Sequence, residues 1–170
     1  PLADSTHFWH RLPLGDNNSQ DSLSLPYPDY SENDTSGVKI VWQHKTGSLI
    51  TSAPTVDATQ AFISTVGGEL LALDIDSGHV NWSWQAGGAI HSTPAVKNTR
   101  VVIGSVDSTI SCISAGNGEL LWQVKSNAPV FSSALVQGRK VYIGNGDGQV
   151  HALNLRNGKT KWTFSEGSGY

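Results

Sequence analysis

The chain of 170 residues contains one cysteine, Cys112, and no methionine. A single thiol excludes an intramolecular disulfide and a zinc site built from several cysteines. Because the chain begins at Pro1 and lacks methionine, we expect it to be an excerpt of a longer protein rather than a complete translation product.

Charged side chains are also scarce, at 15% of the residues, and the formal net charge is -3. The sequence has no run of basic residues, whereas non-specific nucleic-acid binding needs clustered Lys and Arg to displace counterions. No apolar run approaches the roughly 20 residues of a membrane-spanning helix. We therefore expect neither a nucleic-acid partner nor a transmembrane segment.

Tryptophan, by contrast, is frequent, and four of the six tryptophans recur at a constant interval of 40 residues. These four are Trp42, Trp82, Trp122 and Trp162. Three serines (Ser52, Ser92, Ser132) and three glycines (Gly78, Gly118, Gly158) repeat in the same phase. A constant period of roughly this length indicates a repeat architecture in which each unit packs only on its neighbours.

Each unit contains four short, β-branched segments separated by turns rich in Gly, Asn and Asp. The first segments lie near 49–57, 89–97 and 129–137, and residues 38–42 resemble the closing strand of a preceding unit. Four strands per repeat of about 40 residues are typical of a propeller blade. The sequence therefore predicts an all-β fold of three full blades of a partial propeller, each of four antiparallel strands, at about 49–84, 89–125 and 129–165.

A large aromatic ring at one position of every blade is best explained by packing between adjacent blades, because such a ring buries much apolar area. We therefore predict inter-blade packing for the four repeated tryptophans rather than a ligand cage. A closed propeller typically has about four to eight blades. Three blades leave open faces, so we expect either further blades of the same propeller or self-association through the open blade edges.

Four motifs resemble the consensus of the PQQ-like (quinoprotein-like) β-propeller repeat family over about residues 38–165. They are Ser92–Val96, Val141–Gly144, Asp147–Asn154 and Asn157–Trp162. The resemblance implies one of three functions. The first is a non-catalytic scaffold similar to the outer-membrane barrel-assembly lipoprotein, and the second is part of a dehydrogenase that holds pyrroloquinoline quinone. The third is a sensing or regulatory propeller fused to a catalytic domain outside this chain.

The sequence offers little support for a quinone site. Members of the family that hold the quinone against a ring of adjacent cysteines need two thiols, whereas Cys112 aligns with Ala72 and Ala152 and is predicted to be a small core residue. Calcium needs converging carboxylate and amide oxygens. The segment Asp74–Gly78 resembles a calcium loop, but its counterparts in the other blades lack the acids, so we interpret it as a turn.

No catalytic residue, cofactor site or metal site is therefore predicted. Ser132 and Ser133 near His151 or Asp147 suggest a nucleophile, but the repeat already explains the serines as strand positions, and no G-x-S-x-G motif is present. Thr51, His91 and Phe131 occupy equivalent places in the first segments, which line the channel of a propeller. These three residues are the candidates for a channel-facing surface.

Residues 1–37 are polar and proline-containing, and they predict an extended N-terminal arm or linker. His7 and His10 within this arm are interpreted as loop residues rather than half of a metal site. The chain as a whole is predicted to be a non-catalytic module that presents a binding or scaffolding surface to a protein or polymer partner. The family habit favours an extracytoplasmic location, periplasmic or secreted.

Overall fold

The computed structural model describes residues 39–165, so the predicted arm, with His7 and His10, lies outside the described residues. The described part contains twelve β-strands and no helix. The strands are β1 Thr55–Val56, β2 Gln60–Ser64, β3 Glu69–Asp74, β4 Val80–Gln85, β5 Ala95–Lys97, β6 Arg100–Ser105, β7 Thr109–Ser114, β8 Leu120–Lys125, β9 Leu135–Gln137, β10 Lys140–Gly144, β11 Gln149–Asn154 and β12 Thr160–Ser165. Among residues 39–165 no helix is long and apolar enough to cross a membrane.

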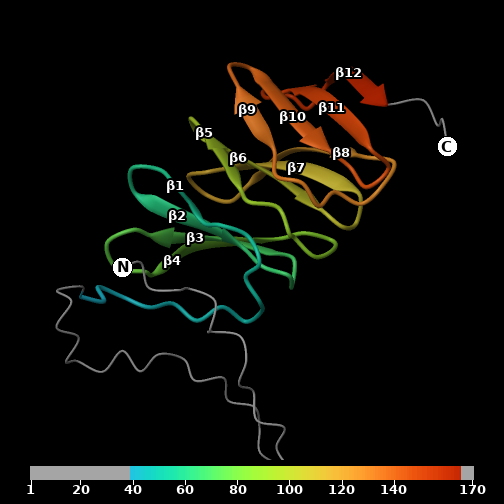
Figure 1. Ribbon diagram of the computed structural model, residues 1–170. Helices are drawn as coiled ribbons and strands as arrows, with labels where there is room; N and C mark the ends of the chain where they lie inside the picture. Colours follow the sequence, from blue (N-terminus) through green and yellow to red (C-terminus); the bar gives the residue numbers. More distant parts are fainter. Residues whose placement is uncertain (1–38, 166–170) are drawn as a thin grey trace, which may run out of the picture. The chain divides into compact units, whose positions relative to one another are not determined.

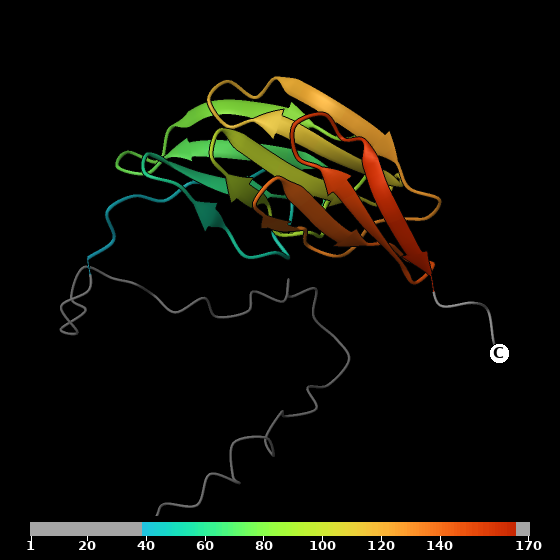
Figure 2. The same cartoon turned by 90° about the horizontal axis from the view of Figure 1, so that it is seen from above.

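The strands form three four-stranded antiparallel sheets, β1–β4, β5–β8 and β9–β12, in which each strand pairs with its neighbours in sequence. We call them blades 1, 2 and 3. Figures 1 and 2 show the blades side by side and fanned out from one another, with the first strand of each blade next to that of the adjoining blade. The predicted fold class, a partial all-β propeller built from four-stranded blades, is confirmed.

The hydrophobic core lies at the two seams between blades. The first seam joins one face of blade 1, including Phe62 and Leu70, to the face of blade 2 that carries Val101 and Ile103. The second seam joins the opposite face of blade 2, with Val102 and Cys112, to blade 3. A four-stranded sheet cannot bury both faces alone, so stacking of the blades supplies the core.

Each repeated tryptophan in a fourth strand lies opposite a small residue of the third strand. Trp82 pairs with Ala72 and Trp122 with Cys112, and in both sheets the register shifts directly after this pair. The pair Ala152 and Trp162 repeats the arrangement in blade 3. A small partner leaves room for the indole ring, and the bulge bends the outer strand locally.

The first strands are shorter than predicted, because pairing begins only at Thr55, Ala95 and Leu135. In blades 2 and 3 the repeated serine explains the difference. The Ser92 hydroxyl donates to the Gly104 carbonyl (3.0 Å) and accepts from the Gly104 amide (3.1 Å), so a side chain takes the place of a ladder partner. Pro94, which has no amide hydrogen, follows two residues later.

The predicted closing strand at 38–42 is not present as a strand in residues 39–48. A strand needs a neighbouring strand to satisfy its backbone groups, and no sheet of the described residues pairs with this segment. Trp42 of this segment nevertheless contacts blade 1 as the other repeated tryptophans contact the blade that follows them, through a hydrogen bond to Ile75.

Candidate functional site

The repeated tryptophans make the same contact across each seam. The indole Nε1 of Trp82 donates to the carbonyl of Ala115 in blade 2 (2.9 Å), and that of Trp122 donates to Leu155 in blade 3 (2.9 Å). Trp42 makes the equivalent bond to Ile75 in blade 1 (2.8 Å). The three acceptors lie at the turn between the third and fourth strands, so each indole ties one unit to the outer turn of the next.

A glycine of that turn lies against the same indole. A Cβ atom at Gly118 would come within 2.8 Å of the Trp82 ring, and Gly118 has a φ of +74°. Gly158 faces Trp122 in the same way. Glycine is required here both for the left-handed backbone and for the close approach of the ring.

Blade 3 leaves the face that carries its tryptophan uncovered by any described residue. Trp162 is 46% exposed, whereas Trp82 and Trp122 are 9% and 8% exposed. Cross-strand neighbours of Trp162 share this face, and Tyr142 lies with its ring centroid 5.9 Å from the Trp162 ring. We call the surface formed by Leu135, Tyr142, Val150, Trp162 and Phe164 the open face.

The three residues predicted to face the channel lie in one row across the three blades. The Thr51 hydroxyl is 3.2 Å from Nδ1 of His91. The His91 ring in turn lies beside Phe131, with centroids 6.0 Å apart and planes tilted by 38°. We call Thr51, His91 and Phe131 the inner row.

The connectors that carry the inner row are held by backbone hydrogen bonds on both sides. Ile90 donates to the Thr65 carbonyl of blade 1, and the Ala89 carbonyl accepts from Val106 of blade 2. The connector before Phe131 is held in the same way by Val130 and Ser105. Ile90 and Val130 are fully buried, so the alternation of an extended chain turns the next residue, His91 or Phe131, outward.

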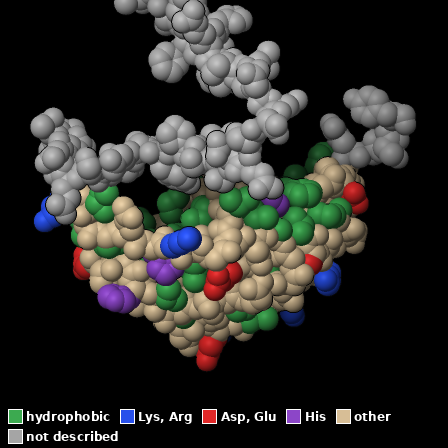
Figure 3. Space-filling view, turned by 90° about the horizontal axis from the view of Figure 1, so that it is seen from below, with side chains coloured by type: hydrophobic (Ala, Val, Ile, Leu, Met, Phe, Trp, Pro, Cys, Tyr) green, Lys and Arg blue, Asp and Glu red, His purple; other side chains and the backbone are tan. Residues whose placement is uncertain are grey.

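The inner row thus offers a hydroxyl, an imidazole and an exposed aromatic ring on a fixed backbone. Phe131 is 54% exposed. Aromatic residues, Phe among them, are enriched in protein–protein interfaces relative to the rest of the surface. Figure 3 shows one face of the molecule, on which hydrophobic patches alternate with polar surface and charged side chains are few.

The structure does not assemble a nucleophile from the serines of blade 3. The Ser132 hydroxyl bonds to the backbone of Gly144, and the Ser133 hydroxyl accepts from the Thr93 amide. His151 instead lies near Ser126 and Thr163, at 3.4 and 3.3 Å. Burial lowers the pKa of His151, which favours its neutral form and fits a structural role.

Neither Cys112 nor Asp74, the two residues weighed for a quinone or calcium site, is free to serve as a ligand. Among residues 39–165 no three His, Cys, Asp or Glu side chains converge to hold a metal ion. Cys112 is fully buried opposite Trp122. The Asp74 carboxylate accepts from the amide and the hydroxyl of Ser77, which lowers the pKa of Asp74 and makes the segment a turn of the chain.

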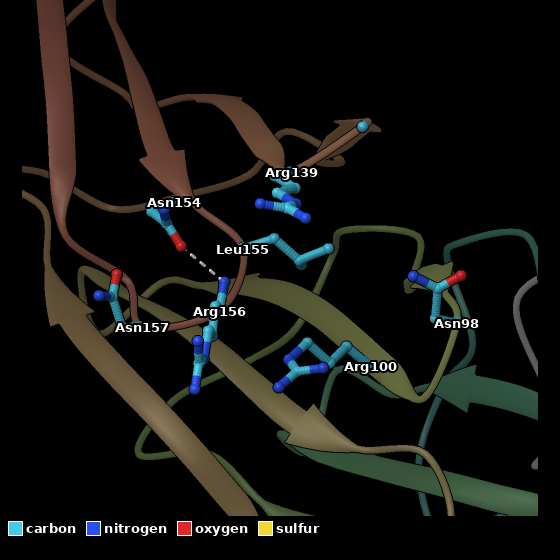
Figure 4. Close-up of a pocket in the computed structure, with 8 residues that line it drawn as sticks. Asn98, Arg100, Arg139, Asn154, Leu155, Arg156 and Asn157 are labelled. Carbon is cyan, nitrogen blue, oxygen red and sulfur yellow. Dashed lines mark hydrogen bonds between the residues drawn. The ribbon is translucent and has the colours of Figure 1, made fainter.

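A cleft in the second seam was not predicted from the sequence. It has a volume of about 560 Å³ and contains three arginines, Arg100, Arg139 and Arg156 (Figure 4). These residues are far apart in the sequence and form no local run of basic residues, so the sequence alone did not predict the cluster. The repeat could have drawn attention to Arg100, because the residue at the same repeat position in blade 1 is the neutral Gln60.

A family model described as outer membrane protein assembly factor BamB matches residues 31–168. The chain is similar in structure to BamB from Moraxella catarrhalis, with a TM-score of 0.66 and 26% identity over 74% of this chain and 39% of that one. It is also similar in fold to a europium-containing methanol dehydrogenase (TM-score 0.66, 20% identity, 74% of this chain and 26% of that one). The computationally designed Ika4 protein is a third structure of this fold (TM-score 0.67, 18% identity, 79% of this chain and 81% of that one).

No curated protein sequence matches the chain. The chain spans well under half of BamB and about a quarter of the dehydrogenase. The resemblance to the PQQ-like repeat family is confirmed by the family model and by these structures.

Proposed function

The chain belongs to the family of outer membrane protein assembly factor BamB, and from this premise we propose that it is a non-catalytic propeller module that binds a protein partner. We place the binding surface at the inner row of Thr51, His91 and Phe131. The observation that carries the proposal is the continuity of this row across three blades, with an exposed aromatic ring at one end.

The physical argument rests on preorganisation. Binding costs less when the contact side chains are already fixed, because less conformational entropy is lost. The connectors of blades 2 and 3 are tied to neighbouring strands, and the His91 imidazole is positioned by Thr51 on one side and by Phe131 on the other. The row can therefore receive an apolar side chain on Phe131 and a polar group of the partner at His91.

The proposed partner is a polypeptide of the machinery that assembles outer-membrane proteins, and the proposed location is extracytoplasmic. The family to which the chain belongs supports both proposals. Site-specific crosslinking in cells tests the surface directly, even while the partner is unidentified. A photo-crosslinking amino acid in place of Phe131 is expected to give one reproducible protein adduct, identified by mass spectrometry.

Leu121 supplies a matched control, because it is an exposed apolar residue (43%) on the outermost strand of blade 2. The same crosslinker at Leu121 is expected not to give that adduct. His91→Ala is expected to reduce the adduct at position 131. Equal adducts at positions 121 and 131, or none at 131, would contradict the proposed surface.

A further inference from the structure

The cleft in the second seam brings three arginines around one space. Arg100 begins β6 of blade 2, Arg139 lies in the turn before β10, and Arg156 lies in the turn after β11 (Figure 4). The remaining lining residues are neutral: Asn98, Gly138, Asn154, Leu155 and Asn157. No acidic side chain is among the eight residues that line the cleft, so none of them neutralises the arginines from within.

The repeat provides an internal comparison for this cleft. Forty residues earlier, the positions of the lining residues are occupied at the first seam by Ala58, Gln60, Asn98, Thr99, Ser114, Ala115, Gly116 and Asn117. None of these is charged, although the first seam packs in the same way. The architecture of the seam therefore does not require the arginines.

Gln60 and Arg100 show the difference in chemistry. The Gln60 side-chain amide donates to the Ala115 carbonyl across the first seam (3.0 Å) and accepts from Asn81 (3.2 Å). At the second seam, the Nε atom of Arg100 is buried and has no hydrogen-bond partner. A buried donor without a partner is costly, and an anion that drew the Arg100 guanidinium toward the cleft would relieve that cost.

The backbone around the cleft is already fixed. The Leu155 amide donates to the Arg139 carbonyl (2.9 Å), which joins the two turns of blade 3 that carry Arg139 and Arg156. The Leu155 carbonyl accepts from the Trp122 indole of blade 2 (2.9 Å), and the Asn154 side chain accepts from the Arg156 amide (2.8 Å). Arg139 and Arg156 therefore project from turns that are tied to each other and to blade 2, while Arg100 begins strand β6.

We infer that this cleft binds a small phosphate-bearing anion through Arg100, Arg139 and Arg156. Guanidinium groups match the oxygens of phosphate in bidentate, charge-assisted hydrogen bonds. Three guanidinium charges call for a ligand with two or three negative charges rather than a monoanion. The volume of about 560 Å³ suits a ligand of small-molecule size.

This inference is independent of the proposed function. Phe131 precedes β9 and Arg139 follows it, so the inner row and the cleft lie at opposite ends of the innermost strands. A ligand in the cleft therefore leaves the inner row accessible. The source of the phosphate is either a free anion or the headgroup of an anionic lipid.

Titration with inorganic pyrophosphate tests the free anion, and flotation with vesicles that contain phosphatidic acid, whose phosphomonoester can carry two negative charges, tests the headgroup. Calorimetry is expected to give saturable binding of pyrophosphate to the wild type. Arg139→Gln/Arg156→Gln, which removes two exposed side chains, is expected to weaken that binding by about tenfold or more, since charge-assisted bonds are lost. Far-UV circular dichroism and the melting temperature without ligand establish that the variant is folded.

Lys39→Gln/Lys45→Gln is the charge-matched control, because it also removes two exposed positive charges, from the segment before β1. This control is expected to bind pyrophosphate as the wild type does. Vesicle binding that depends on Arg139 and Arg156, with no pyrophosphate binding, would assign the phosphate to a lipid headgroup. The inference is wrong if the wild type binds neither probe, or if the arginine and lysine variants bind equally.

Discussion

Cys112 illustrates how the fold sets the chemistry of a single residue. Its side chain is fully buried in the second seam, opposite the Trp122 ring. Burial disfavours the thiolate and raises the pKa of Cys112 to about 12, although the nearby positive charge of Arg100 opposes this in part. The thiol occupies the place of an alanine in the other two blades, and its role is to fill space.

We predict that the Cys112 thiol is unreactive in the native protein. At pH 8 only a very small fraction is thiolate, and the thiolate is the nucleophile. Iodoacetamide followed by mass spectrometry is expected to leave native Cys112 unmodified and to alkylate it after unfolding in guanidinium. A Cys112→Ala/Lys45→Cys variant, with an exposed thiol, is expected to react rapidly; rapid labelling of native Cys112 would contradict its burial.

The short first strands show how a side chain can replace part of a sheet. Ser92 and Ser132 each exchange two hydrogen bonds with the backbone of a glycine in the second strand, Gly104 or Gly144. The chain can then leave the ladder and form the connector that carries the inner row. The repeated serine therefore positions the site as well as the strand.

Ser92→Ala is expected to destabilise the protein by about 1–3 kcal/mol, because a buried amide and a buried carbonyl of Gly104 lose their partner. Ser132→Ala removes the same pair of bonds at an exposed place, where water can substitute. Its cost is expected to be smaller. Urea unfolding of both variants measures the difference, and equal losses would show that burial of the serine does not govern its contribution.

The three blades form two seams, but each of the three fourth strands carries a repeated tryptophan, so one tryptophan has no seam to fill. Trp82 and Trp122 each face a following blade, whereas Trp162 lies on the open face. In a repeat protein, stability is approximately a sum of unit and interface contributions. The same residue type at the same repeat position is therefore expected to contribute different amounts.

Trp122→Phe is expected to cost about 1–3 kcal/mol, because the Leu155 carbonyl loses the indole donor in a buried seam. Trp162→Phe is expected to cost less than about 0.5 kcal/mol, as is usual for exposed sites. The free energy of unfolding in urea, compared between the two variants, is the measurement. A large loss for Trp162→Phe would mean that the open face is covered in solution, for example by a second copy of the chain.

Much of the fold followed from the sequence because the repeat is local. The strand segments, the turns with their glycines and the interval between tryptophans are each encoded within about 40 residues, so their phase predicted both the blades and the alignment of Thr51, His91 and Phe131. The predicted lengths of the first strands were wrong because a serine hydroxyl can hydrogen-bond to the backbone amide and carbonyl of the second strand in place of a paired strand. Pattern alone does not distinguish them.

The cleft and the open face were decided only by the packing of one blade on the next. Arg100, Arg139 and Arg156 occupy three different positions of the repeat, so no comparison of equivalent positions groups them. They meet because the rotation between blades 2 and 3 brings the β5–β6 turn of blade 2 beside the β9–β10 and β11–β12 turns of blade 3. That rotation depends on how the buried side chains of the seam fit together, which is a property of the whole interface and not of any segment of the chain.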